Sequence, residues 1–540
     1  MCSIVFDAEV VSPPSHLNVA FFEDVLETAL RTTRVQMLTI HIRMGSSTGE
    51  NYCSQIYRAN VSFKRPDHPE QHMAFIVKSV PHLNSVEFIE DLEVYLKEKI
   101  TYHEVLPRLE LMMQCKRRFG PNKMCSIVFD AEVVSPPSHL NVAFFEDVLE
   151  TALRTTRVQM LTIHIRMGSS TGENYCSQIY RANVSFKRPD HPEQHMAFIV
   201  KSVPHLNSVE FIEDLEVYLK EKITYHEVLP RLELMMQCKR RFGPKLFQCI
   251  KRPESTLVFE DLSQMDFVMA SREIGLDEEH CLLVMERLAE FHATSMVLAV
   301  LDPHIFDAYA DGMLSPRGLA KDDGMLMRFF SGNGKELHNL VSSWPGFERI
   351  AEKIEKYLQN QRCNLVRSQA PQDNEVKVLN HGDLWVNNML FKYDTAHRPQ
   401  DLILIDFQLS VWGSPGIDLN YFFYTSLTLD VLRHRRPQLL RCYHARLAKT
   451  LLNLDLGVPV PSYEQIQNEV HRREAYGFFA SYGIFPTVSQ DKAQTADNNL
   501  ENFKDEDFAK HKVRQMFESR RLAETLRYSL PHFERAGVLD

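Results

Sequence analysis

HGDLWVNN at positions 381–388 and LILIDFQ at positions 402–408 are the two stretches that decide how this chain folds and works. Asp383 is followed five residues later by Asn388. Another 17 residues separate Asn388 from Asp406, which ends an apolar, strand-like run. Oxygen-bearing side chains of this kind suit a hard cation such as Mg²⁺. A carboxylate, an amide and a second carboxylate in this order favour phosphoryl transfer from a nucleotide.

The three side chains divide that chemistry among them. Asp383 is predicted to act as the base or to orient the acceptor hydroxyl, whereas Asn388 and Asp406 are predicted to hold the metal. Asn387 is an alternative to Asn388, but the five-residue spacing from Asp383 favours Asn388. Taken alone, HGD could be a loop turn and DFQ could be the end of any buried strand. Their combination is what indicates a site.

The chain around these stretches is expected to be mainly helical from about residue 263 onward, because apolar residues recur there at three- and four-residue spacing. In chain order, the sequence predicts helices over residues 282–299 and 346–358, brief strands at 377–380, 389–391 and 402–407, further helices from residue 419, and a polar, loop-like segment over 488–507.

The preceding part of the chain indicates a small sheet with two helices, which makes the whole an α+β protein. In chain order, we expect a helix over residues 144–154, strands at 163–167, 179–186 and 196–203, a helix over 208–229 that Pro230 ends, and a strand at 256–259.

The first part of the chain is a duplicate. Residues 1–121 reappear, identical at every position, as residues 124–244, with Asn122 and Lys123 between them. Even positions with no structural role match, so selection on the folded protein does not explain the identity. A recent exon duplication or a gene-model artefact is the favoured interpretation. The alternative is a working tandem domain.

Composition excludes several classes of protein. The chain has 540 residues, with 61 Lys and Arg against 71 Asp and Glu, and no long basic run, so nucleic acid is not an expected partner. No stretch approaches the roughly 18 apolar residues of a membrane span. The start MCSIVFDAEVV lacks a basic n-region, and the cysteines form no C-x-x-C pair. A cytoplasmic protein with free thiols is therefore expected.

HGDLWVNN, LILIDFQ and the segment SPGIDLNYFF at positions 414–423 are very similar to the CHK kinase-like family, the ecdysteroid kinase-like proteins. This family is related to choline kinases and aminoglycoside phosphotransferases within the protein-kinase-like fold. The resemblance covers residues 124–540 and includes GENYCS, FIVKSVP, YHEVLP, VFEDL and LAEFHATS. It implies two lobes, a β-rich N-lobe at 124–262 and a helical C-lobe at 263–540. Residues 1–123 would be an extra copy of most of the N-lobe.

The resemblance also implies roles in the smaller lobe. Gly172, Asn174 and Ser177 would lie in the turn that covers the phosphates, although one glycine makes this a weak Gly-rich loop and Ser177 could simply be a turn residue. Lys201 lies in an apolar strand, where an unpaired ammonium is costly, so Glu221 and the nucleotide phosphates would be its partners. The alternative is an edge lysine that reaches solvent.

Other residues are expected to support the site rather than to react. Residues 258–262 resemble the hinge whose backbone would contact adenine, which assigns Glu260 and Leu262 to nucleotide binding. Asp418 is expected to be a structural brace and Trp385 to pack beside the catalytic loop. We expect two histidines, His292 and His381, to hold backbone by hydrogen bonds.

The expected activity is ATP- and Mg²⁺-dependent phosphorylation of a small molecule. Only six residues lie between Gln408 and Pro415, which is too short for the activation segment that holds a peptide substrate, and no A-P-E sequence follows. The resemblance implies a small, lipophilic alcohol such as an ecdysteroid as acceptor. No nucleic acid, membrane or obligate protein partner is expected. The alternatives are a catalytically inactive kinase-fold binding protein and a protein kinase.

The duplicate repeats only part of this site. Gly49, Ser54, Lys78 and Glu98 are its equivalents of the N-lobe residues, but the chain has no second Asp383 or Asp406. At most one site can therefore be complete. We expect residues 124–244 to form it with the rest of the chain, because they are contiguous with the strand at 256–259.

Overall fold

The computed structural model divides the chain into two compact units, Met1–Asn122 and Lys123–Asp540. It describes residues 3–6, 18–30, 36–44, 55–65, 70–79, 126–130, 137, 139–155, 158–168, 177–189, 191–203, 216–237, 240–250, 255–319, 324–491, 494 and 505–540.

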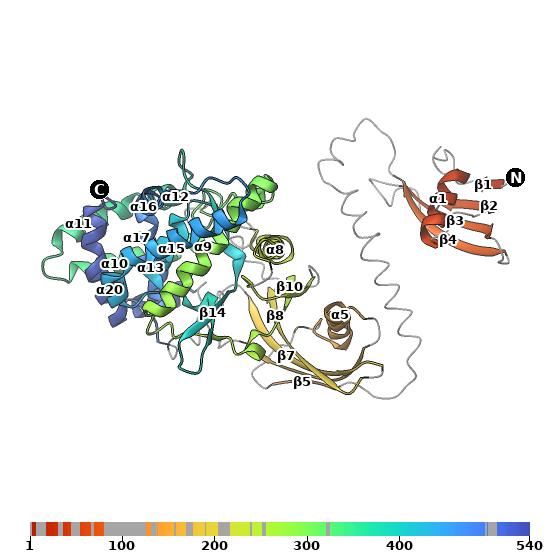
Figure 1. Ribbon diagram of the computed structural model, residues 1–540, viewed down its shortest axis with the longest axis horizontal. Helices are drawn as coiled ribbons and strands as arrows, with labels where there is room; N and C mark the ends of the chain where they lie inside the picture. The colour runs from red at the N-terminus through yellow and green to blue at the C-terminus, as the bar shows by residue number, and fades with distance from the viewer. Residues whose placement is uncertain are drawn as a thin grey trace. The chain divides into compact units, whose positions relative to one another are not determined.

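The described part of the first unit is a four-stranded sheet with one helix (Figure 1). Phe22 and Leu26 of the helix are fully buried with Ile40, Ile42 and other residues of the strands. Its elements are β1 (Ser3–Phe6), α1 (Val19–Leu30), β2 (Gln36–Met44), β3 (Gln55–Lys64) and β4 (Gln71–Ser79), with the strands in the order β1-β2-β3-β4.

The second unit begins with the same elements, followed by two further strands in one six-stranded sheet of order β5-β6-β7-β8-β10-β9. Its pairing register repeats that of the first sheet with 123 added to each number: Ser3 pairs with Thr39, and Ser126 pairs with Thr162. The elements are β5 (Ser126–Phe129), α5 (Val142–Leu153), β6 (Gln159–Met167), β7 (Gln178–Lys187), β8 (Gln194–Val203), β9 (Leu246–Ile250) and β10 (Ser255–Glu260).

Two strands of this sheet are absent from the prediction made from sequence. β5 is a four-residue strand parallel to β6, and β9 pairs antiparallel with β10. Both are short and lie at the two edges of the sheet, where no long alternating pattern marks them. The predicted helix at 144–154 corresponds to α5, which Asn141 caps by accepting a hydrogen bond from the backbone N–H of Phe144.

The prediction that Pro230 ends a helix is wrong. The helix continues through it as α7 (Val217–Ile223), a π-helical turn (Thr224–Val228) and α8 (Leu229–Met235). In the π turn the N–H of Leu229 bonds to the carbonyl of Thr224, five residues back. The wider turn accommodates a proline, which has no N–H to donate and would otherwise crowd the preceding turn. Residues 208–215 of the predicted helix lie outside the described residues.

The remainder of the second unit is mainly helical, with two small sheets, β11-β13-β14 and β12-β15 (Figure 1). Its described α-helices and strands are β11 (Val268–Met269), α9 (Glu278–Leu301), α10 (Met325–Ser342), α11 (Glu348–Gln359), α12 (Gln361–Gln369), β12 (Val378–Asn380), β13 (Met389–Tyr393), β14 (Pro399–Leu404), β15 (Val411–Gly413), α13 (Gly416–Thr425), α14 (Leu429–His434), α15 (Arg436–Leu454), α16 (Tyr463–Arg472), α17 (Glu474–Phe479), α18 (Phe485–Val488), α19 (Glu506–Met516) and α20 (Arg520–Arg535).

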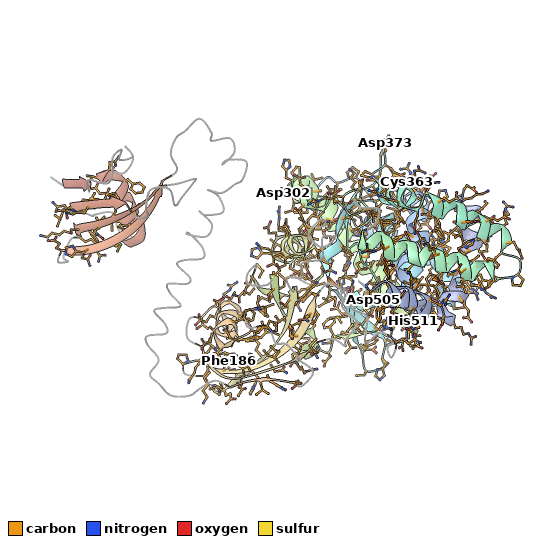
Figure 2. The ribbon with its side chains drawn as sticks, turned by 180° about the vertical axis from the view of Figure 1, so that it is seen from behind. Phe186, Asp302, Cys363, Asp373, Asp505 and His511 are labelled. Carbon is orange, nitrogen blue, oxygen red and sulfur yellow. The ribbon has the colours of Figure 1, made fainter. Side chains whose placement is uncertain are left out.

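This mixture of helices and sheets confirms the expected α+β class and fits a kinase-like fold. α9 is buried over most of its length and packs along α15. Cys281 on α9 is a buried free thiol, whereas Cys363 on α12 is an exposed one (Figure 2). Among the described helices, none combines the length and hydropathy that a membrane span requires.

Candidate functional site

A single cavity of about 1760 Å³ in the second unit brings most of the predicted site residues together. Gly172 and Asn174 lie outside the described residues, as do Gly49, Ser54, Glu98 and the side chain of Lys78 in the first unit. The predicted residues that line the cavity are Ser177, Lys201, Glu221, Glu260, Leu262, Asp383, Asn388 and Asp406. They come from the start of β7, from β8 and α7, from the end of β10 and the turn after it, and from the loops that follow β12 and β14.

Lys201 bridges two carboxylates in this cavity. Its Nζ lies 2.7 Å from Oε2 of Glu221 and 2.7 Å from Oδ1 of Asp406. It also donates to Oε1 of Gln408 at 3.2 Å. The lysine is only 6% exposed, so its head group does not extend into solvent. It lies among acceptors that hold the ammonium in place.

The charges around Lys201 shift the acidity of both partners. Burial alone would lower the pKa of Lys201, but the attraction of Asp406 and Glu221 outweighs it and raises that pKa, so the lysine stays protonated. Burial raises the pKa of Glu221 to about 7, with the negative charge of Asp406 adding to the effect and Lys201 opposing it. One ammonium does not neutralise two carboxylates, of which Glu221 is buried and Asp406 is partly exposed.

Asp406 does not lie in a strand, contrary to the prediction for residues 402–407. β14 ends at Leu404, and Asp406 has a left-handed backbone (φ 67°, ψ 61°) that leads into a short 3₁₀ turn at Phe407–Leu409. Aspartate tolerates this conformation better than most residues. Its N–H donates a hydrogen bond at 3.1 Å to the hydroxyl oxygen of Tyr225, a residue of the π turn. This bend directs the carboxylate toward Lys201 rather than along the strand.

The side chain of Asn388 is hydrogen-bonded to Asp383, and these bonds fix the orientation of the Asn388 amide. The Nδ2 atom of Asn388 donates to the carbonyl oxygen of Asp383 at 2.9 Å and to its Oδ2 at 3.0 Å. Since the nitrogen must face these acceptors, the amide oxygen faces the other way and stays available to a cation. Burial raises the pKa of Asp383; the charge of Asp406 adds to this rise, and a hydrogen bond from Tyr421 opposes it.

The turn that carries Asp383 is held by Asp418, as the sequence predicts for a structural brace. Oδ2 of Asp418 accepts from the N–H of His381 at 2.6 Å, and Oδ1 accepts from the N–H of Gly382 at 2.9 Å. Gly382 has φ +82°, and a Cβ there would lie 1.9 Å from the carbonyl oxygen of Leu409. The loop after β12 therefore lies backbone to backbone against the loop after β14, which brings Asp383 close to Asp406.

The two histidines differ in what they hold. Nε2 of His381 contacts the carbonyl oxygen of Ile405 at 2.9 Å, as predicted. For His292 the prediction of a backbone contact is wrong, because its ring contacts two side chains, the hydroxyl of Tyr443 at 2.8 Å and Oδ2 of Asp418 at 3.2 Å. Burial lowers the pKa of His292, so the neutral ring supports the Asp418 brace.

The predicted hinge at residues 258–262 includes the last three residues of β10 and the two that follow. The Glu260 side chain accepts hydrogen bonds from the guanidinium of Arg241 and from the N–H of Lys245, at 2.6 Å in the second case. This ties the end of β10 to the start of β9. Leu262 is 3% exposed at the cavity wall and begins a 3₁₀ turn that Asp261 caps.

The donor set suits Mg²⁺ with nucleotide better than a metal held by protein alone. Within the described ranges, no group of three or more His, Cys, Asp or Glu side chains could hold a metal ion. Asn388 and Asp406 offer one amide and one carboxylate to the same cavity. Mg²⁺ commonly takes one or two such oxygens from protein and completes its shell with water and phosphate. The residues therefore fit this cation as a partner of ATP.

Three residues of the site are missing from the sequence-based prediction: Tyr225, Gln408 and Tyr421. Tyr225 and Tyr421 are 5% and 1% exposed, and their hydroxyls contact Asp406 and Asp383. A buried tyrosine hydroxyl needs a polar partner, and this general signal could have drawn attention to Tyr421, three residues after Asp418. The contact itself is not local in sequence.

Comparison with known proteins identifies the family of the chain. No curated protein matches the chain. The model of the ecdysteroid kinase-like family matches residues 48–157 and 171–456. The second match includes Lys201, Glu221, the HGDLWVNN and LILIDFQ stretches and SPGIDLNYFF. The chain therefore belongs to the ecdysteroid kinase-like family.

Proposed function

We propose that the protein is an ATP- and Mg²⁺-dependent O-phosphotransferase whose acceptor is a hydroxyl of a small, lipophilic alcohol such as an ecdysteroid. Membership of a kinase-like, generally phosphotransferase-like family supports a small-molecule kinase in broad terms. The observation that carries the proposal is the convergence of Lys201, Glu221, Asp383, Asn388 and Asp406 on one cavity.

In this proposal each group has one task. Lys201, held by Glu221, orients the phosphates of the nucleotide. Asn388 and Asp406 would hold Mg²⁺, which supplies positive charge to the phosphoryl oxygens when it is bound. Asp383 orients the acceptor hydroxyl and takes its proton. Ser177 lies at the cavity wall, where its hydroxyl can donate to a phosphate oxygen.

The cavity wall supports a lipophilic acceptor. Beyond Asp383 and Tyr421, the cavity continues between α10, α18 and α19, and Figure 2 labels His511 on the last of these. Much of this wall is apolar, and it includes Leu326, Phe329, Ile484, Val488 and Val513. An apolar surface of this kind favours a largely hydrocarbon molecule with a hydroxyl near Asp383.

The short connection after Asp406 supports a small molecule rather than a peptide. The six residues between Gln408 and Pro415 contain part of a 3₁₀ turn and β15, which pairs with β12. A peptide-binding segment would need more chain than this. We propose that the acceptor is a free small molecule and that transfer requires no nucleic acid, membrane or protein partner.

We also propose a two-lobe arrangement for the second unit, with residues 124–262 as the N-lobe and residues 263–540 as the C-lobe. The repeated register of the two sheets supports residues 1–123 as an extra, partial N-lobe. Since the first copy brings no Asp383 or Asp406, deletion of residues 1–123 should preserve activity and improve solubility. A deletion that abolished activity would show that the first copy is needed.

The test is phosphorylation of a panel of alcohols by the full chain and by residues 124–540 with MgATP, read by product mass. The panel contains ecdysteroids, choline, ethanolamine and aminoglycosides. Asp383→Ala is the control, and it should abolish transfer while folding and nucleotide binding persist. Unchanged turnover in this variant would contradict the assignment of Asp383 as the base.

The second candidate is a kinase-fold binding protein without turnover. Nucleotide binding that does not depend on Mg²⁺, with no product from any alcohol, would favour it. Slow, Asp383-dependent release of ADP without an acceptor would instead favour an enzyme whose alcohol is missing from the panel.

A further inference from the structure

Both oxygens of the Asp383 carboxylate accept a hydrogen bond from a protein side chain. Oδ2 accepts from Nδ2 of Asn388 at 3.0 Å, and Oδ1 accepts from the hydroxyl of Tyr421 at 2.5 Å. Asn388 is five residues from Asp383, but Tyr421 is 38 residues away on α13. The two donors therefore approach from separate segments, and a rotation of the carboxylate would break at least one of the bonds.

Tyr421 is itself rigidly placed. Every residue of α13 is buried, and Tyr421 is 1% exposed. The carbonyl oxygen of Tyr421 accepts from Oγ1 of Thr425 at 2.7 Å. Its ring packs against Tyr476 of α17, with ring centroids 6.2 Å apart, and α13 and α17 lie side by side (Figure 1). The hydroxyl can therefore act as a fixed point for Asp383.

The same helix also holds the backbone of the catalytic turn. Asp418 lies three residues before Tyr421, so the two share one face of α13. Asp418 accepts from the N–H groups of His381 and Gly382, while Tyr421 donates to the side chain of Asp383. One face of α13 thus fixes both the backbone and the carboxylate of the HGD turn.

We infer that Tyr421 is a positioning residue for phosphoryl transfer, acting through Asp383. The inference rests on the proposed role of Asp383. A carboxylate oxygen accepts more than one hydrogen bond, so Oδ1 can hold Tyr421 and still receive the acceptor hydroxyl. A base must lie about 2.6–3.2 Å from the proton donor, and a carboxylate held at both oxygens reaches that geometry without further ordering.

Tyr476 provides a matched control. It is fully buried beside Tyr421, and its hydroxyl is among those without a hydrogen-bond partner in the part of the chain that the structure describes. Tyr421→Phe and Tyr476→Phe each remove one buried hydroxyl from the same aromatic pair. Only the first substitution removes a contact to Asp383.

The experiment measures kcat and KM of the full chain and of both variants with MgATP and whichever alcohol of the panel the wild type phosphorylates. Tyr421→Phe should lower kcat about ten-fold or more, the usual effect of losing a hydrogen bond to a charged group. KM for MgATP should not change. Tyr476→Phe should behave as the wild type. An unchanged kcat in Tyr421→Phe, or an equal loss in Tyr476→Phe, would overturn the inference.

A second measurement does not require turnover. Crystal structures of the wild type and both variants should show the Asp383 carboxylate rotated, or in two orientations, in Tyr421→Phe alone. A carboxylate that keeps its orientation in Tyr421→Phe would overturn the positioning role. If the wild type phosphorylates none of the alcohols, the proposed function is in question, while these structures still decide whether Tyr421 positions Asp383.

Discussion

Nζ of Lys201 lies 2.7 Å from Oδ1 of Asp406 and 2.7 Å from Oε2 of Glu221, so one ammonium stands between two carboxylates. The arrangement has a net negative charge in a cavity where Lys201 and Glu221 are buried and Asp406 is partly exposed. The excess negative charge contributes to the raised pKa of Glu221, together with burial. A divalent cation at Asp406 would supply the missing positive charge. The excess negative charge therefore favours binding of a metal ion together with the nucleotide.

Asp406→Asn should remove the negative charge at this position while keeping a side chain of nearly the same shape. Asparagine, unlike alanine, tolerates the left-handed backbone at this position, so the fold should persist. Without the carboxylate, Mg²⁺ loses a charged ligand worth several kcal/mol, and kcat/KM should fall about 100-fold or more. Steady-state kinetics over a range of Mg²⁺ concentrations, with a thermal melt as control, measure both effects. Wild-type Mg²⁺ dependence would exclude Asp406 as a ligand.

Gly382→Ala should destabilise the fold through two effects that a control can separate. The new Cβ would meet the carbonyl oxygen of Leu409, and φ of +82° is unfavourable for alanine. Gly346 has φ +86° with no atom within 4 Å of the added Cβ, so Gly346→Ala carries only the backbone strain. Urea unfolding should show a loss of about 1 kcal/mol for Gly346→Ala and at least 2–3 kcal/mol for Gly382→Ala. Equal losses would mean that the loops separate easily.

Asp418→Asn should weaken both stability and activity. Both carboxylate oxygens accept from backbone N–H groups, and an asparagine would turn one N–H of its amide toward another donor. At a fully buried site the loss should be about 2–4 kcal/mol of unfolding free energy.

Asp394 gives a matched comparison for Asp418. Its Oδ1 also accepts from two backbone N–H groups, those of Ala396 and Arg398, but in an exposed turn. Chemical denaturation should show a smaller loss for Asp394→Asn, because water can replace the missing acceptor. A larger loss for Asp394→Asn than for Asp418→Asn would contradict the brace.

Lys220 should make stability depend on pH in the alkaline range. Burial lowers the pKa of its ammonium to about 8, with Arg317 acting in the same direction and with Asp311 and Glu216 opposing it. In the unfolded chain the pKa returns to about 10.5. The destabilisation is therefore fully present below pH 8, and it disappears as the pH rises to about 10.5.

The test compares the wild type with Lys220→Met by urea unfolding between pH 7 and pH 10.5. The unfolding free energy of the wild type relative to the variant should rise by about 2–3 kcal/mol across this range. Because all other groups are shared, they cancel in the difference. A difference that stayed constant with pH would show that Lys220 titrates normally.

The sequence predicted those parts of the molecule that local patterns specify. Apolar periodicity located α5, α9, α11 and the strands β6 to β8 within a few residues. Short segments at sheet edges, such as β5 and β9, carry too few residues for a pattern and depend on partners distant in sequence. The helix through Pro230 depends on a π turn, which no periodicity of 3.6 describes.

For the site, the sequence predicted which side chains would matter but not how they are joined. The spacing from Asp383 to Asn388 and Asp406 was enough to propose a metal and a base. The bond from Lys201 to Asp406 spans 205 residues, and that from the N–H of Asp406 to Tyr225 spans 181. Such contacts arise from the packing of α7 and β8 against the loop after β14, which a single sequence does not display.

The left-handed backbone at Asp406 also limits how this chain can evolve. Two independent requirements act on the position, one from the proposed cation and one from the main chain. If a descendant lost the need for catalysis, only the first would relax, and the main chain would still favour asparagine or glycine there. Asn or Gly at this position, beside an intact HGD turn, would therefore mark a lineage that had kept the fold after losing the reaction.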